Sequence, residues 1–504
     1  MELKVKKIDM CSDKYVVLLN ETDAKELSVH SEDRIKIKYK GEEQISIVIT
    51  SKNMVGQGFI GVPPLLFEEL SLEEGKEISV IPSSKPRSIG YIKKKINGKK
   101  LTKDEIYTLI HDITNDALSD IELSSYITAV YIRGCDLDET EWMTRAMVDT
   151  GDEIHFDDRI FDVHSIGGVP GNKYALLTVP IVAAQGLKIP KTSTRAISSA
   201  AGTADVMDVL TNVELDVSKI KMMLDKIGGV LAWGGSVNLA PADDKIVKVE
   251  KPMGLDPHYQ VLASVLAKKK ATGVTSLVID LPIGEGTKIL DEEMVGTYAR
   301  DFIELGKRLG INVECVVTYG GQPVGRAIGP ALEAKEGMMA LEGKWVSRSL
   351  IDKATKLAGI ILEMGGVAKR NEGTKLALET LKSGEALKKF LEIIDMQGSE
   401  GITKSDDIPL GKYTSDIISR ESGYIQGISN SSLVKIAKAA GAPKNKGAGI
   451  WLYKKNGHQV EKDEKIFTIY ADSKLKLDYA VKLANQLKPI KIVGMVLDRI
   501  PSYH

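Results

Sequence analysis

Short runs of alternating apolar and polar residues fill the first part of the chain, up to about residue 84. These runs are Glu2–Ile8, Tyr15–Leu19, Asp33–Tyr39, Gln44–Thr50 and Glu77–Ile81. Alternation with a period of two is typical of strands that bury one face. The stretch Pro82–Pro86 that follows is typical of a linker. We therefore predict a β-rich, barrel-like domain over residues 1–84, which is a candidate for driving oligomerisation.

From residue 85 to about residue 152 the pattern changes, and apolar residues recur at intervals of three and four. Ser124–Arg133 and Asp138–Asp149 are the clearest examples. This spacing predicts amphipathic helices. Residues 85–152 are therefore expected to form a helical domain.

Beyond residue 152, apolar strands alternate with glycine loops and helices. Strands are expected at Ile160–Val163, Gly229–Trp233, Ser276–Leu281 and Val313–Thr318. Such alternation predicts an α/β sheet whose site lies at the carboxyl ends of its strands. Residues 153–242 and 273–410 are assigned to this α/β domain, and residues 411–504 to a smaller α+β portion.

Composition and charge narrow the possible functions. The 68 basic and 69 acidic residues nearly cancel, which argues against nucleic-acid or membrane partners. The three cysteines are far apart and the seven histidines lack metal-ligand spacing, so we expect reduced thiols and no metal site. With no signal peptide and no apolar run of about 18–20 residues, the chain is expected to be cytoplasmic.

Two segments at strand ends are candidates for binding an anion. In Asp162–Gly168, a serine hydroxyl and a histidine stand beside two glycines, which let backbone amides approach a ligand. In Lys191–Thr203, six hydroxyls and one arginine fall within thirteen residues, a composition that suits a phosphate dianion. The alternatives are a tight turn whose histidine only packs, and a Ser/Thr-rich loop that caps a helix.

Two further segments carry weaker indications. Ser264 and Lys268 lie four residues apart on a predicted helix that follows Asp256-Pro257, so they share one face. Asp256 could equally be a helix N-cap. The loop Gly284–Lys288 follows a buried strand, and its lysine could reach a phosphate or a ribose. By contrast, Gly56–Gly61 fits a dinucleotide-binding pattern but lacks the βαβ context that this pattern requires.

Four ordered motifs resemble the thymidine/pyrimidine-nucleoside phosphorylase family. They are D-x-H-S-x-G-G at Asp162–Gly168, S-x-R…G-T at Ser193–Thr203, L-A-P-A-D at Leu239–Asp243 and A-S-x-L-A-K-K at Ala263–Lys269. The resemblance runs from about residue 85 to the C-terminus. It is closest to the archaeal branch that acts on nucleoside 5′-monophosphates, whose members carry an extra N-terminal domain of similar length.

The resemblance implies an α/β multidomain fold like that of type II nucleoside phosphorylases. In such a fold a helical domain, completed here by residues 243–272, accompanies a mixed-sheet α/β domain. The implied reaction is phosphorolysis of AMP to adenine and ribose 1,5-bisphosphate, with CMP and UMP as further substrates. It implies a homodimer or higher homo-oligomer, and no cofactor, since inorganic phosphate is a co-substrate.

Departures from the nucleoside-cleaving branch support a nucleotide substrate. That branch has a lysine where this chain has Val163, and a glycine-rich loop with a histidine where this chain has Ala196, Ser198 and Ser199. The loss of a cation and the gain of hydroxyls are expected if the substrate carries its own 5′-phosphate. A pyrimidine nucleoside phosphorylase remains the nearest alternative. A more distant one is an anthranilate phosphoribosyltransferase-like enzyme, which would use magnesium and acidic pairs such as Asp243-Asp244.

The resemblance also implies roles for individual residues. Asp256 would be the proton donor to the base, with His164 as the rival acid. Inorganic phosphate would bind Ser165, Ser193 and Thr203. The nucleotide would bind Gly168, Thr194, Arg195, Ala196, Ile197, Ser198, Ser199, Thr203, Ser264, Lys268 and Lys288.

Overall fold

The computed structural model describes residues 1–12, 14–196, 199–399 and 401–495. The chain divides into two compact units. The first consists of Met1–Thr150 and Ala240–Ser264, and the second of Gly151–Leu239 and Val265–His504. Each unit is described by itself.

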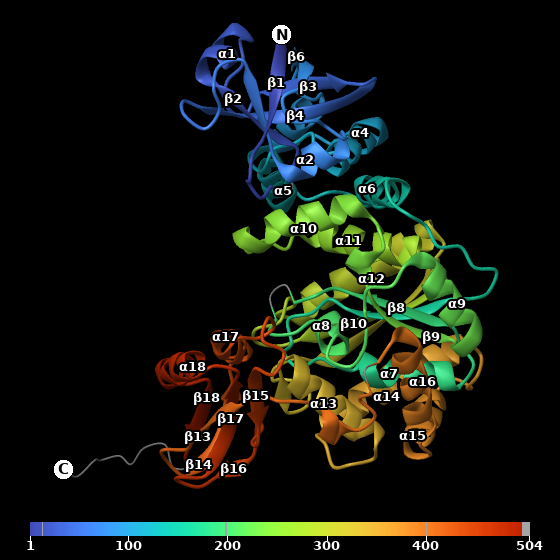
Figure 1. The fold of residues 1–504 in the computed structure, drawn as a ribbon. Helices are drawn as coiled ribbons and strands as arrows, with labels where there is room; N and C mark the ends of the chain where they lie inside the picture. The colour runs from blue at the N-terminus through green and yellow to red at the C-terminus, as the bar shows by residue number, and fades with distance from the viewer. Residues whose placement is uncertain (13, 197–198, 400, 496–504) are drawn as a thin grey trace. The chain divides into compact units, whose positions relative to one another are not determined.

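The first unit begins with a closed six-stranded barrel, which confirms the predicted β-rich domain (Figure 1). Around the barrel the strand order is β1-β5-β2-β4-β3-β6. In β3, Ile35 and Ile37 are buried in the barrel core while Lys38 is exposed, as the alternating pattern requires. The strands are β1 (Glu2–Lys7), β2 (Val16–Asn20), β3 (Arg34–Tyr39), β4 (Glu42–Ser51), β5 (Phe59–Val62) and β6 (Glu77–Ser83), with short helices α1 (Glu21–Glu26) and α2 (Pro64–Glu69).

Helices make up the rest of the first unit. They are α3 (Ser88–Ile96), α4 (Lys103–Thr114), α5 (Asp120–Arg133), α6 (Leu137–Asp149), α10 (Pro241–Met253) and the first half of α11 (His258–Ala271). Capping boxes start α4, α5 and α6, because each N-cap side chain accepts from the N3 amide and the N3 glutamate reaches back. The buried Arg34 of the barrel donates to the carbonyl of Ala117 (2.8 Å) and pairs with Glu122, which ties the barrel to α5.

Five parallel strands form the core of the second unit. β11 (Asn312–Tyr319), β10 (Ser276–Ile283) and β7 (Phe161–Ser165) make one sheet, and β8 (Ile189–Ser193) pairs with β9 (Gly229–Trp233). A parallel bridge between Ile160 and Lys188 joins β7 to β8. The carboxyl ends of the strands therefore lie at one edge. The surrounding helices are α7 (Ala175–Ala184), α8 (Thr203–Met207), α9 (Val217–Ile227), α12 (Glu292–Leu309), α13 (Pro330–Leu341), α14 (Arg348–Met364), α15 (Gly373–Lys382) and α16 (Glu385–Gln397), with 3₁₀ turns at Gly234–Ser236 and Ser405–Asp407.

The C-terminal portion of the second unit contains two small sheets and two helices (Figure 1, red). One sheet has the order β12-β15-β17-β13 and the other β16-β14-β18. The elements are β12 (Ala327–Ile328), β13 (Tyr413–Ile418), β14 (Gly423–Ile428), α17 (Asn430–Ala440), β15 (Gly449–Leu452), β16 (Gln459–Val460), β17 (Lys465–Ala471), α18 (Lys474–Leu487) and β18 (Ile490–Val493). The helical and α/β fold class predicted from the sequence is confirmed. Among the described helices, none combines the length and apolarity that a membrane span needs.

Candidate active site

The carboxyl ends of β7, β8 and β10 bring most of the predicted anion-binding residues to one edge of the second unit. Ser165 ends β7, Ser193 ends β8, and the loop that contains Lys288 follows β10. His164 and Ser165 pair in register with Ile279 and Asp280 of β10. Segments more than a hundred residues apart thus present their loops together, as open α/β sheets commonly do around a ligand.

The end of β7 supplies a hydroxyl and an imidazole. The Ser165 Oγ accepts hydrogen bonds from the side-chain amide of Asn172 (3.1 Å) and the backbone amide of Gly167 (3.4 Å). Its own proton is used in neither bond and can be donated to an anion. His164 is half-buried, and its Nδ1 is shielded from solvent without a hydrogen-bond partner among the described residues. Burial, followed by the nearby ammonium of Lys191, lowers the pKa of His164 well below its usual value, so the ring is neutral at pH 7.

Gly168 brings the loops after β7 and β10 into direct contact. Its φ is +92°, and a Cβ at this position would lie 2.8 Å from the Cα of Thr287 and 2.9 Å from the backbone nitrogen of Lys288. Only glycine fits such a conformation and such a close approach. Gly168 and Lys288, predicted from separate motifs, are therefore neighbours.

The loop after β8 is held in shape by acidic residues that follow it. One carboxylate oxygen of Asp205 accepts from the amides of Ala196 (2.6 Å) and Gly202 (2.9 Å). The Arg195 guanidinium pairs with Asp208 (3.1 Å) and Glu214 (3.3 Å), and it lies over the Trp233 ring. These contacts order the loop, and the predicted contact of Arg195 with the nucleotide stays a prediction.

The remaining predicted residues of this loop are partly described. The Ser193 Oγ donates to the carbonyl of Ala232 (3.3 Å), and the Ser199 Oγ donates to that of Ala201 (2.8 Å). Thr194 is exposed, and Thr203 begins α8. The predictions for Ile197 and Ser198 fall outside the described residues.

Behind the strand ends lies a buried charged cluster that sequence reasoning missed. The Lys269 ammonium pairs with the Asp162 carboxylate at 2.6 Å, and both side chains are fully buried. Lys269 also approaches the carbonyl and hydroxyl of Thr192, each at 3.4 Å. The nearby Lys191 is buried too, and its ammonium donates to the Thr192 carbonyl at 3.0 Å. Because Asp162 and Lys269 are 107 positions apart, only their motif membership could have linked them.

Two predicted residues belong to the first unit. Asp256 is exposed and lies between α10 and α11. The Ser264 hydroxyl donates to the buried Asp243 carboxylate at 2.8 Å, which fixes the orientation of the serine. The boundary between the units follows Ser264, so Lys268, four residues along α11 and half-buried, falls in the second unit.

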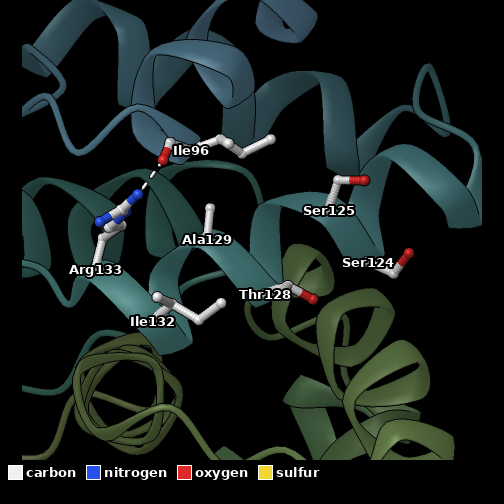
Figure 2. A pocket seen from close by; sticks show the side chains of 7 residues that line it. All are labelled: Ile96, Ser124, Ser125, Thr128, Ala129, Ile132 and Arg133. Carbon is white, nitrogen blue, oxygen red and sulfur yellow. Dashed lines mark hydrogen bonds between the residues drawn. The ribbon is translucent and has the colours of Figure 1, made fainter.

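A separate pocket in the first unit has a different character. It is lined by Ile96, Ser124, Ser125, Thr128, Ala129, Ile132 and Arg133 (Figure 2). The Arg133 Nε donates to the carbonyl of Ile96 at 3.1 Å, and the hydroxyls of Ser124 and Ser125 donate to the Ile121 carbonyl within α5. The pocket includes none of the predicted site residues.

Metal-binding geometry is absent from the described part of the chain, where no group of three or more His, Cys, Asp or Glu side chains could hold an ion. The absence of a cofactor stays a prediction.

Three family models match the chain. The helical bundle domain of the glycosyl transferase family matches residues 89–151, and the a/b domain of that family matches residues 157–387. The pyrimidine nucleoside phosphorylase C-terminal domain matches residues 424–491.

Relatives extend the similarity over the whole chain, including the barrel. The chain is 50% identical to the AMP phosphorylase of Methanosarcina mazei, covering 100% of this chain and 99% of that protein. It is 51% identical to the AMP phosphorylase of Methanococcus aeolicus and 49% identical to that of Thermococcus kodakarensis, each covering 99% of both chains.

More distant solved structures share the fold. The anthranilate phosphoribosyltransferase of Thermus thermophilus matches with a TM-score of 0.52 at 21% identity, covering 61% of this chain and 98% of that one. The yeast enzyme, in complex with PRPP and Mg, matches with a TM-score of 0.50 at 16% identity, covering 62% and 98%.

The predicted family is thereby confirmed, and neither alternative is favoured. With about half of its residues identical to these relatives over its full length, the chain belongs to the AMP phosphorylase family.

Proposed function

We propose that this chain catalyses the phosphorolysis of nucleoside 5′-monophosphates. AMP and inorganic phosphate would give adenine and ribose 1,5-bisphosphate, with CMP and UMP as further substrates. One observation carries the proposal in a chain of this family. Ser165 and Ser193 end neighbouring strands at the same edge of the sheet, where Gly168 also contacts the backbone of Lys288. Hydroxyl donors, backbone amides and lysines are the groups that a phosphate dianion needs.

The substrate-binding roles follow the motifs. Inorganic phosphate binds the hydroxyls of Ser165, Ser193 and Thr203. The nucleotide binds Gly168, Thr194, Arg195, Ala196, Ile197, Ser198, Ser199, Thr203, Ser264, Lys268 and Lys288. Within this set Arg195 acts through its ion pairs with Asp208 and Glu214, which hold the loop in its binding shape.

In the reaction, a phosphate oxygen forms a bond to C1′ of the ribose while the bond from C1′ to the base breaks. The electron pair of that bond leaves with the base, and the sugar passes through a state with oxocarbenium character. Hydroxyls that hold the phosphate in line with C1′ lower the entropic cost of reaching the transition state. The departing base must gain a proton.

We assign that proton to Asp256. A general acid must hold a proton that it can give to the departing base. His164 is the alternative donor. Burial and the neighbouring lysines lower its pKa well below its usual value, so in the ligand-free chain at pH 7 the ring is neutral and its remaining N–H is a very weak acid. This difference favours Asp256.

The test is the release of free base from AMP as a function of inorganic phosphate. Adenosine and thymidine are run in parallel, and the sugar product is identified. We expect adenine and ribose 1,5-bisphosphate from AMP and little turnover of the nucleosides. Asp256→Asn should lower kcat by about 10²- to 10⁴-fold, the usual contribution of a general acid. Phosphate-independent cleavage, or faster cleavage of the nucleosides, would contradict the proposal.

We also propose that the chain forms a homodimer and that the barrel drives assembly beyond it. Light scattering of the full chain and of residues 85–504 tests this idea. The barrel-free chain should be a smaller oligomer. An unchanged number of subunits would overturn the role given to the barrel.

A further inference from the structure

Lys191 is a buried lysine of β8 to which the reaction described above gives no role. The residue is 3% exposed. The ammonium lies 3.0 Å from the carbonyl oxygen of Thr192, so the side chain extends along the strand towards Ser193. It therefore points to the strand end at which the phosphate-binding hydroxyls are proposed to lie.

A parallel bridge, between Ile160 and Lys188, joins the start of β7 to the start of β8. From there β7 continues through the fully buried Val163 and ends at Ser165, while β8 continues through Lys191 and ends at Ser193. Because side chains alternate along a strand, Lys191 lies on the same side of β8 as Ser193, one step before the strand end.

No carboxylate balances Lys191. Within the described residues, its ammonium has no acidic oxygen within 4.0 Å, and its hydrogen-bond acceptor is one neutral carbonyl. The carboxylate of this cluster, Asp162, is already paired with Lys269. Lys191 and Lys269 are thus two buried ammonium groups beside one buried carboxylate. The cluster therefore carries more positive than negative charge.

A buried charge without a partner is costly. In the ligand-free chain, burial and the neighbouring Lys269 lower the pKa of Lys191 to about 7, against the opposing effect of Asp162. An anion at the strand end would remove this cost by pairing with the ammonium. The Lys191 ammonium would thus have a counter-ion only when such an anion is bound.

We propose that Lys191 binds inorganic phosphate directly, its ammonium turning from the Thr192 carbonyl to a phosphate oxygen held by Ser165 and Ser193. The proton that completes the ammonium is taken from solvent as the phosphate binds. No other bond forms or breaks in this step. The identity of the anion rests on the proposed function, but the placement of the cation does not.

The test is calorimetric titration of the full-length protein with inorganic phosphate. Lys191→Met removes the charge and keeps the length of the side chain. The matched control is Lys188→Met, because Lys188 precedes the other end of β8 and pairs with Asp158 and Asp225 near the surface. Losing a charge-assisted hydrogen bond is expected to weaken phosphate binding about 10- to 100-fold in Lys191→Met, and hardly at all in the control.

The pH dependence separates a phosphate ligand from a structural lysine. Between about pH 8 and pH 9.5 phosphate is a dianion and His164 is already neutral. The wild-type Kd should therefore rise by up to tenfold per pH unit, because each binding event needs one proton. Lys191→Met should show no such rise. Lys191→Arg, which stays charged, should bind phosphate with little pH dependence.

These outcomes decide the proposal separately from the proposed function. Equal phosphate affinities for Lys191→Met and wild type would overturn it even if AMP is cleaved. An unaltered pH dependence in Lys191→Arg would also overturn it, and this variant serves if Lys191→Met does not fold. If AMP is not cleaved but phosphate binds with the expected loss in Lys191→Met, the proposed function fails and the cation site stands.

Discussion

Lys173 and Lys191 are both buried in the second unit, and they are surrounded in opposite ways. The Lys173 ammonium pairs with Glu336 at 3.0 Å and donates to the carbonyls of Gly171, Val324 and Ala327. Lys191 has one carbonyl and no carboxylate partner among the described residues. The first lysine has every partner that it can use, whereas the second lacks a counter-ion.

Lys455 shows that burial alone does not make this difference. Burial lowers its pKa to about 7, as it does for Lys191. Yet Lys455 donates to the carbonyls of Pro323 and Gly325, and Glu336 and Glu333 lie in the same cluster. In that cluster Lys173, Lys455 and Arg326 lie near Glu336 and Glu333, so two acids offset part of the positive charge. A lowered pKa alone therefore does not mark a binding site, and the position of Lys191, two residues before the end of β8, is what distinguishes it.

The largest loss of stability is expected at the buried pair of Lys173 and Glu336. Glu336→Gln leaves the Lys173 ammonium buried without its carboxylate, which typically costs about 3–5 kcal/mol. The midpoint of urea unfolding should fall accordingly. The double variant Lys173→Met with Glu336→Leu should recover part of this loss, because it removes both charges of the pair, whereas the amides of Arg326 and Ala327 still lose their acceptor. Unchanged stability in Glu336→Gln would contradict the claim that Lys173 depends on Glu336 as its buried counter-ion.

Removing Lys191 should change the folding stability in the opposite direction, because this lysine has no counter-ion in the part of the chain that the structure describes. Between the pKa of about 7 in the folded chain and the ordinary value of 10.5, the unfolded chain holds a proton that folded Lys191 lacks. Folding stability therefore rises with pH across this window. Lys191→Met should stabilise the ligand-free protein by an amount of the order of 4 kcal/mol near pH 7, and by less as the pH approaches 10. A destabilised variant at pH 7 would show that the charge is balanced after all.

Gly168→Ala tests the packing of the loops rather than their charge. The added methyl group would meet the backbone of Thr287 and Lys288 below 3.0 Å, in a conformation that disfavours side chains. We expect a loss of about 1–3 kcal/mol of stability and a larger loss of kcat/KM for AMP, because both loops must shift. The control Gly366→Ala also has a positive φ but lies in open space, so it should lose stability alone.

The smallest effect is expected for Arg195→Gln. About a third of the side chain is exposed, and such ion pairs contribute at most about 1 kcal/mol. The KM for AMP should therefore rise less than about tenfold, while the Kd for phosphate stays unchanged. A much larger rise in KM would mean that Arg195 leaves Asp208 and Glu214 to contact the nucleotide itself.

Much of this site could be predicted from the sequence, because the residue types of its loops form recognisable local patterns. Glycines and hydroxyls directly after apolar strands predicted the edge that holds Ser165, Gly168 and Ser193. The N-terminal barrel was equally accessible from its alternating pattern. What a linear pattern could not provide was pairing between distant segments, such as Asp162 with Lys269 or Ser264 with Asp243.

The interpretation of Val163 shows the same limit. Its place in the motif indicated a lost cation, since related enzymes have a lysine there. The structure puts Lys191 on β8, which a bridge joins to the strand of Val163, and a sequence motif gives no reason to look there. The acids that hold the Thr194–Gly202 loop were missed similarly, because Asp205 and Asp208 follow the hydroxyl-rich stretch instead of lying within it.

The most direct test of the account is the number of protons taken up when inorganic phosphate binds. Calorimetry at about pH 8.5, in two buffers that differ in ionisation enthalpy, gives this number for wild type and for Lys191→Met. We expect close to one proton per phosphate for wild type and close to zero for the variant. The same number for both proteins would mean that Lys191 is a structural lysine and that bound phosphate does not act as its counter-ion.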